Sequence, residues 1–199
     1  MAIDSGASAL GLVGHMPSGP GVISDELIRI IAASVPPPIA TFLLTSETST
    51  DRIISHHRKV NTNTLQLVDA VEPGTYALIR EALPSVKIVQ VIHVTGREAV
   101  DEALKVAEQV DALLLDSGNP MLKTKILGGT GLRHDWSISR EIVEKSKKPV
   151  FLAGGLNPDN VREAIETVAP FGLDLCNGVR TDGKLDPKKL GKFFQAITG

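Results

Sequence analysis

The stretch from Pro149 to Pro158 reads PVFLAGGLNP and indicates how the chain folds. Its first half is a short apolar run of the kind that forms a buried strand. Its second half carries a helix start signal, Asn157 with proline in the first helical position. A strand that passes through Gly-Gly into a helix is one βα unit, and the same order recurs along the chain. The sequence therefore predicts a repeated βα architecture.

Seven short apolar or β-branched runs are predicted to be strands. They are more continuously apolar than alternating, which is typical of strands covered on both faces and favours a parallel sheet. Segments with helical periodicity lie between them, such as Leu27 to Ile31, and helix starts are indicated by Ser24 and by Asp186 before Pro187. The predicted strands are Ala9 to Val13, Ile39 to Leu44, Thr64 to Leu67, Lys87 to Val94, Ala112 to Leu115, Pro149 to Ala153 and Gly172 to Leu175.

The position of the glycines separates the two architectures that βα alternation permits, a closed barrel and an open doubly wound sheet. An open dinucleotide-binding sheet needs G-x-G-x-x-G directly after its first strand, and the nearest match, Gly11 to Gly14, lies mostly within the strand. The other notable glycines follow the last three strands, where barrels commonly bind phosphate. We therefore predict an α/β fold, a TIM-type barrel of seven βα units that forms a single domain over residues 1–199.

Composition narrows the class of protein further. The chain has 21 Lys and Arg against 23 Asp and Glu, a net charge of −2, and no basic tract, so nucleic acid and anionic membranes are not expected partners. Cys176 is its single cysteine, which excludes an intrachain disulfide and suits a cytoplasmic location. No signal peptide, apolar membrane span or metal-ligand spacing is found. His56 and His57 are expected to be solvated on a helix.

Three glycine-containing loops are candidates for binding an anion. Gly128, Gly129, Thr130 and Gly131 follow one strand and can let backbone N–H groups approach an anion, or they form a plain flexible turn. Gly154-Gly155 lies between a strand end and a helix start, which favours phosphate, although tight packing alone also explains it. Asn177-Gly178 has the same placement after the last strand. The last two loops together predict one phosphate site.

Two aspartates are candidates for acid–base chemistry. Asp116 ends the run LLLD and is expected at the carboxyl end of a strand, where it either acts as an acid or caps the next loop. Asp174 is acidic within an apolar strand, so it is expected either in the site or in a structural ion pair. Cys176 is interpreted as a small buried apolar residue.

These motifs resemble those of the phosphoribosylanthranilate isomerase family, the barrel enzymes of tryptophan biosynthesis. The resemblance implies an Amadori rearrangement of a phosphorylated sugar, from an N-linked aldose to the ketose, with no cofactor. It makes Asp116 the acid, Asp174 a residue facing the substrate, and the loops at Gly154-Gly155 and Asn177-Gly178 the phosphate site. The motifs that carry it are LLLDS (113–117), GGTG with DW (128–136), LAGGLNPDNV (152–161) and GLDL with NGV (172–179).

The chain departs from the family pattern in three places. The family opens with a strand that ends in a cysteine, the general base, and this first βα unit is expected to be missing here, leaving seven units. The family's histidine after Gln-Leu is replaced by Val68, and its Ser-Pro-Arg, whose arginine takes the anthranilate carboxylate, corresponds to Pro17 to Gly21 without an arginine. A barrel without its first strand exposes two edges, so a homodimer is expected.

Three functions are compatible with these observations. The first is an isomerase of the phosphoribosylanthranilate type. The second is a non-catalytic phosphosugar-binding barrel that kept the phosphate loops and lost the base. The third is a barrel enzyme that acts on another phosphorylated sugar, which the absent arginine and histidine permit. Fold alone does not distinguish among them.

Overall fold

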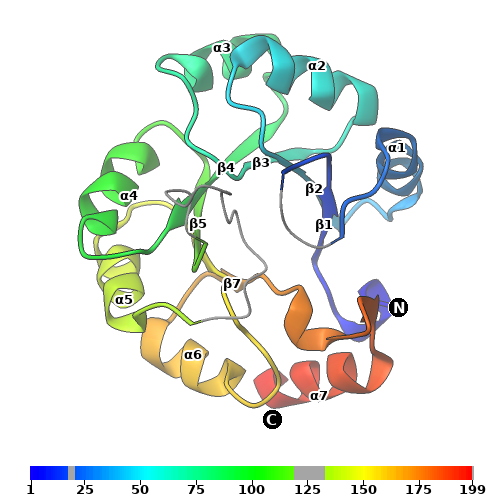
Figure 1. Cartoon of the computed structure of the whole chain (residues 1–199), viewed down its shortest axis with the longest axis vertical. Helices are drawn as coiled ribbons and strands as arrows, with labels where there is room; N and C mark the ends of the chain where they lie inside the picture. Colours follow the sequence, from blue (N-terminus) through cyan, green and yellow to red (C-terminus); the bar gives the residue numbers. More distant parts are fainter. Residues whose placement is uncertain (18–20, 119–132, 199) are drawn as a thin grey trace.

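The computed structural model describes residues 1–17, 21–118 and 133–198. A parallel sheet curls through the middle of the molecule, and helices surround its outer side (Figure 1). The strands of this sheet are β1 (Ala9–Val13), β2 (Ala40–Thr45), β3 (Thr64–Leu67), β4 (Lys87–His93), β5 (Ala112–Asp116), β6 (Val150–Leu152) and β7 (Gly172–Leu173). The helices are α1 (Asp25–Ser34), α2 (Thr50–Val60), α3 (Thr75–Ala82), α4 (Ala99–Ala107), α5 (Trp136–Lys145), α6 (Val161–Val168) and α7 (Pro187–Thr198). Two short 3₁₀ helices, η1 (Ile3–Ser5) and η2 (Asn177–Val179), and a hairpin of β8 (Arg180–Thr181) and β9 (Lys184–Leu185) complete the described elements.

Strands β1 to β7 pair in sequence order, each with the next, and every pair in this sheet is parallel. This confirms the α/β fold with a parallel sheet of seven strands. The register places His93 of β4 opposite Asp116 of β5, and Leu115 opposite Leu152 of β6. Because all the strands point the same way, their carboxyl ends meet at one end of the curled sheet.

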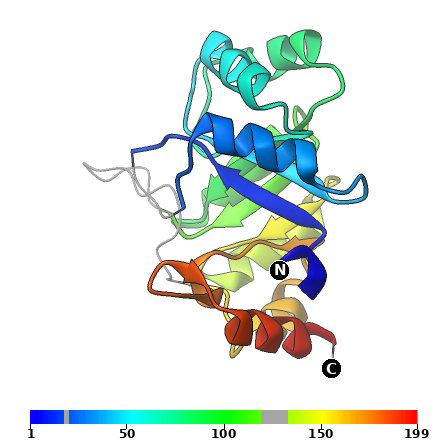
Figure 2. The same ribbon diagram turned by 90° about the vertical axis from the view of Figure 1, so that its right-hand side faces the viewer.

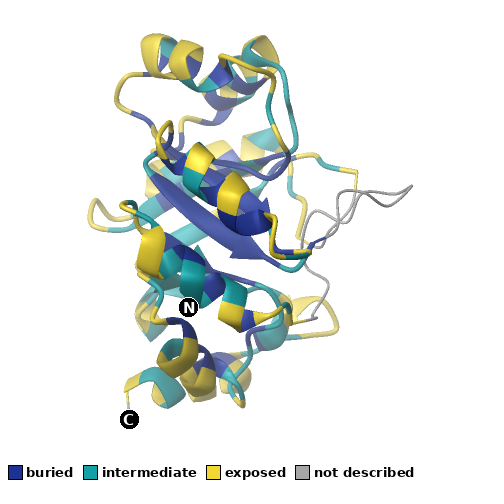
Figure 3. Ribbon diagram, turned by 90° about the vertical axis from the view of Figure 1, so that its left-hand side faces the viewer, coloured by how far each residue is buried: buried dark blue, intermediate teal, exposed yellow. Residues whose placement is uncertain are grey.

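Apolar side chains cover both faces of the sheet. Ile88 and Ile92 of β4 belong to the large cluster between the strands and the helices, whereas Val89 and Val91 belong to a smaller cluster with Ala112, Leu114 and Ala153. The alternation along one strand assigns the smaller cluster to the inner face of the curl. The strands are accordingly buried, while the outward sides of the helices are exposed (Figure 3). This explains the continuously apolar strands of the sequence.

The sheet has two edges, β1 and β7, because no hydrogen bonds join these two strands among the described residues. Near the edges, the N-terminal η1 lies against the C-terminal helix α7, with the Gly6 backbone close to the Phe194 ring. The two ends of the chain therefore lie side by side (Figure 2). Val22 before α1 and Leu27 and Ile30 on α1 are large apolar residues that are exposed, and Val22 forms a bridge to Val13 of the edge strand β1.

Two predicted helix starts are confirmed and one is wrong. The Ser24 hydroxyl caps α1 by accepting the N–H of Leu27 at 3.2 Å, and Asp186 precedes α7 as expected. Asn157, in contrast, does not begin α6, which starts at Val161. The Asn157 N–H donates to Asn160 Oδ1 at 2.9 Å, so these residues form a separate turn before the helix.

The expectation that His56 and His57 are solvated is also wrong. His57 lies on the same buried face of α2 as Ile53 and Val60, its ring bonds the Thr62 carbonyl at 2.7 Å, and burial lowers its pKa. His56 bridges two elements: its ring nitrogens lie 3.1 Å from Thr45 Oγ1 and 3.1 Å from Asp25 Oδ1. The charged neighbours that follow them on the helix conceal this inward face in the sequence.

A search of the described helices finds none that is both long and apolar enough to cross a membrane.

Candidate active site

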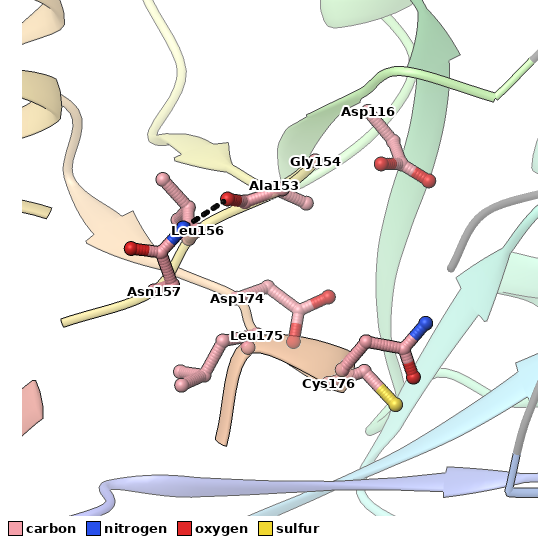
Figure 4. A pocket seen from close by; sticks show the side chains of 11 residues that line it. Asp116, Ala153, Gly154, Leu156, Asn157, Asp174, Leu175 and Cys176 are labelled. Atoms are coloured by element: carbon pink, nitrogen blue, oxygen red, sulfur yellow. Dashed lines mark hydrogen bonds between the residues drawn. The ribbon is translucent and has the colours of Figure 1, made fainter. Parts of the chain in front are cut away.

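A cavity of about 260 Å³ opens at the carboxyl ends of β5, β6 and β7. Figure 4 shows the side chains of Asp116 and Asp174 directed into this space, with Cys176 beside them. Three consecutive segments of the chain therefore meet at one cavity. The lining residues are Asp116, Ala153, Gly154, Gly155, Leu156, Asn157, Asp174, Leu175, Cys176, Asn177 and Gly178.

Asp116 is the last residue of β5, as predicted, and only 7% of its surface is exposed. Its side chain points to the inner face of the curl, because it alternates with Leu113 and Leu115, which face the helices. Burial raises the pKa of the Asp116 carboxyl, opposed in part by the Ser117 N–H bonded to Oδ1 at 2.8 Å and by His93. Asp116 therefore has both features that the sequence predicted as alternatives, a capping hydrogen bond and a raised pKa.

Asp174 lies just after β7 and not within a strand, which corrects the prediction that Gly172 to Leu175 is extended. The N–H of Asp174 still pairs with the Leu152 carbonyl at 2.8 Å, and the chain then turns toward η2. Burial raises the pKa of the Asp174 carboxyl to about 6, with a further contribution from the charge of Asp116. No salt bridge joins Asp174 to a cation within the described part of the chain, so the ion-pair alternative lacks support.

The two carboxyl groups form one titrating pair, because the charge of Asp116 raises the pKa of Asp174. In such a pair, the first proton to be lost leaves the second held more tightly. The cavity thus holds two carboxyl groups whose pKa values are raised by burial.

The turn after β6 has a backbone that requires glycine. Gly154 and Gly155 have φ values of 85° and 67°, in the left-handed region where residues with a Cβ are strained. A Cβ on Gly154 would also lie 2.8 Å from Ser117 Oγ. The Gly155 carbonyl accepts from the side-chain amides of Asn157 and Asn160 at 3.2 and 2.9 Å. The amides therefore hold the turn in this shape at the border of the cavity.

The loop after β7 packs directly on this turn. A Cβ added to Gly178 would collide with the carbonyl oxygen of Leu156, so only glycine permits the contact. Gly178 lies in η2, and both Asn177 and Gly178 line the cavity with Gly154 and Gly155. The structure thus brings together the two loops that the sequence predicted to act jointly. Gly128, Gly129, Thr130 and Gly131 lie outside the described residues.

Sequence reasoning missed two residues near the cavity. Cys176 was interpreted only as a small buried residue, but it is half-buried and lines the cavity, and burial raises the pKa of its thiol. Cys176 lies two residues after Asp174, and residues at this spacing in an extended chain point to the same side. The spacing was therefore a signal that the two side chains lie together. His93 ends its strand next to Asp116 and bonds the Val68 carbonyl at 2.9 Å, a polar strand end of the same kind as Asp116.

Comparison with known proteins accounts for this arrangement. Residues 2–196 match the family model described as N-(5'-phosphoribosyl)anthranilate (PRA) isomerase. The chain belongs to the PRA isomerase family. The family and the isomerase class predicted from the sequence are thereby confirmed.

Individual members of the PRA isomerase family align over nearly the whole chain. The N-(5'-phosphoribosyl)anthranilate isomerase of Methanocella arvoryzae is 32% identical over 194 residues, which cover 97% of this chain and 89% of that protein. A crystal structure of PRA isomerase in complex with reduced 1-(o-carboxyphenylamino)-1-deoxyribulose 5-phosphate is 28% identical with a TM-score of 0.78, covering 100% of this chain and 91% of that one. A structure of monomers generated from the dimeric Thermotoga maritima enzyme is 27% identical with a TM-score of 0.79 and the same coverage, 100% and 91%.

No group of three or more His, Cys, Asp or Glu side chains within residues 1–17, 21–118 and 133–198 is arranged to hold a metal ion.

The raised pKa of Asp174 has a consequence for stability. A carboxyl whose pKa is about 6 in the folded protein and 3.8 in the unfolded chain makes folding less favourable as pH rises through this interval. Asp174→Asn removes that cost, so it should increase the free energy of unfolding by about 1–3 kcal/mol near pH 7.5 and by much less near pH 4. Denaturant unfolding at the two pH values measures the difference.

Asp159→Asn is the matched control, because Asp159 is exposed in the neighbouring turn. It should change stability equally little at both pH values. A pH-independent effect of Asp174→Asn would show that burial does not penalise the Asp174 charge.

Proposed function

We propose that this protein isomerises N-(5'-phosphoribosyl)anthranilate, converting an N-linked ribose phosphate to the corresponding ketose. The observation that carries the proposal is the cavity itself, which joins two carboxyl groups of raised pKa to two glycine loops on adjacent strands. The family membership and the phosphorylated ligand in the related crystal structure support the choice of substrate.

In the proposed reaction, Asp116 is the acid. The ribose ring opens when its oxygen receives a proton while the lone pair of the anthranilate nitrogen forms a C=N bond at C1'. Burial raises the pKa of Asp116, which favours its protonated form relative to an aspartate in water, and its position at a strand end directs it into the cavity. The match to the family motif supports the same role.

We assign the base to Asp174. After ring opening, the proton on C2' must leave, and its bonding electrons form an enolamine that tautomerises to the ketone. The Asp174 carboxylate faces the same cavity, and a pKa of about 6 makes it largely ionised near pH 7 yet basic enough to accept this proton. The raised pKa therefore serves proton removal.

The phosphate is proposed to bind between the turn at Gly154-Gly155 and the loop at Asn177-Gly178. Both loops line the cavity, and glycine allows the backbone to approach an anion closely. Gly128, Gly129, Thr130 and Gly131 are included on the sequence motif alone, as residues that contact the substrate.

The chain is further proposed to form one barrel domain whose strands β1 to β7 correspond to the second to eighth strands of an eight-stranded barrel. The two edges β1 and β7 would then flank the position of the first strand. The single cysteine supports a cytoplasmic location.

We also infer that the protein is a dimer. Val22 next to the edge strand β1 and Leu27 and Ile30 on α1 are exposed, and an uncovered edge with exposed apolar residues favours association. The description of the Thermotoga maritima relative as dimeric supports a second copy of this chain as the partner.

Asp116→Asn tests the catalytic proposal. The amide keeps the shape of the side chain but provides no acidic proton, so turnover should fall about 10²- to 10⁴-fold. The decrease in fluorescence of N-(5'-phosphoribosyl)anthranilate measures turnover, and calorimetry with the reduced ketose analogue measures binding. Asp159→Asn should retain full turnover. Unchanged turnover in Asp116→Asn would remove this residue from the mechanism, and a wild type that binds the analogue without turnover would identify a binding protein.

Gly178→Ala tests the phosphate site. The added methyl group must push the Leu156 carbonyl away and separate the two loops, so affinity for the phosphorylated analogue should fall at least about 10-fold. Gly191→Ala in α7 is the control, since a Cβ there meets no atom within 4 Å. Equal affinity in a folded Gly178→Ala protein would place the phosphate elsewhere.

Ile30→Glu tests the dimer. A charge on the apolar surface beside β1 should convert the dimer to a monomer in sedimentation at micromolar concentration. Leu78→Glu is a matched control on α3, because Ile30 and Leu78 are both 50% exposed. A wild-type monomer, or dissociation by both variants alike, would contradict this interface.

A further inference from the structure

The cavity contains acidic groups and lacks a cation of its own. Its described lining includes the carboxyl groups of Asp116 and Asp174 but neither lysine nor arginine. The substrate of the proposed function carries a phosphate and a carboxylate on its aromatic ring. The glycine loops offer backbone N–H groups to the phosphate, so the aromatic carboxylate needs a positive group from outside this lining.

Arg180 is the cation that touches the lining. It is the first residue of β8, directly after the cavity loop of η2, and its positive charge lies near enough to lower the pKa of the Cys176 thiol against the effect of burial. Its Nη1 donates to the Gly183 carbonyl at 2.8 Å, which holds the side chain against the hairpin. The guanidinium is therefore fixed next to a cavity residue and does not extend freely into solvent.

The same guanidinium reaches across to the opposite edge of the sheet. Arg180 Nη2 lies 3.8 Å from the place that a Cβ of Gly21 would occupy, and Val13 of β1 is equally close to that place. Gly21 comes from the segment of Pro17 to Gly21, where the family resemblance implied an arginine for the carboxylate. The Arg180 guanidinium thus lies near Gly21, the last residue of that segment.

The hydrogen bonds of Arg180 are incomplete. Its Nε–H is buried and finds no acceptor within the residues that the structure describes. A buried donor without a partner is costly, and a guanidinium offers five N–H donors in a fork that fits a carboxylate. A ligand carboxylate would supply the missing acceptors.

We propose that Arg180 binds the carboxylate of the anthranilate ring and so selects substrates that carry it. This inference rests on the proposed function, because that function supplies the carboxylate. Arg180 replaces the arginine that the family places after the first strand of this chain, reaching the same ring from the loop that follows β7. It acts in specificity and takes no part in proton transfer.

Binding of two phosphorylated ligands tests the proposal. One is reduced 1-(o-carboxyphenylamino)-1-deoxyribulose 5-phosphate, and the other is the same compound without the carboxyl group. Wild-type protein should bind the carboxylated ligand about 10- to 100-fold more tightly, as expected for charge-assisted hydrogen bonds. Arg180→Met should reduce this preference to within about 3-fold while leaving affinity for the carboxyl-free ligand nearly unchanged.

Two further variants complete the experiment. Arg180→Lys, which keeps the charge but loses the fork, should retain part of the preference. Lys184→Met removes an exposed charge from the same hairpin and should retain all of it. A preference that survives in Arg180→Met, or a wild type that binds both ligands equally, overturns the role of Arg180 while the proposed function stands. Failure of the wild type to bind either ligand would instead contradict the proposed function.

Discussion

The site depends on the parallel register of β5, β6 and β7, which ends three strands at one border of the sheet. Asp116 is the last residue of its strand, the Gly154 turn begins one residue after the end of the next, and Asp174 follows β7 directly. The hydrogen bond from the Asp174 N–H to the Leu152 carbonyl fixes the position of the segment after β7 along the neighbouring strand β6. A shift of this pairing would move the second carboxyl group away from the cavity.

Burial of the two carboxyl groups sets their chemistry. Asp116 is buried and Asp174 partly buried, and no salt bridge joins either of them to a cation among the described residues, so the neutral form of each is favoured relative to water. A nearby lysine or arginine would reverse this effect and hold both groups ionised. The charge of Arg180 affects the pKa of Cys176 and not that of either aspartate, which leaves the aspartates mainly under the control of burial.

The strands and the glycine loops could be predicted from the sequence because apolar runs and Gly-Gly before a helix are local signals. Asp116 was also visible, since it interrupts an apolar run at its end. His57 was not, because its charged neighbours Arg58 and Lys59 obscure the periodicity that places it inward. Arg180 could not be found by local reasoning either. Its proposed role depends on its position near Gly21, which lies at the other end of the chain and is brought near only by the curl of the sheet.

The packing of Gly178 on the Leu156 carbonyl also limits how this family member can evolve. Every replacement of a glycine adds at least a Cβ to its Cα, so each single substitution at this position meets the same obstacle. No single substitution at Gly178 therefore leaves this packing unchanged. Gly191 differs, because its surroundings admit a side chain. A substitution at Gly178 requires the turn after β6 to move first. The turn after β6 and the loop after β7 can therefore change only together.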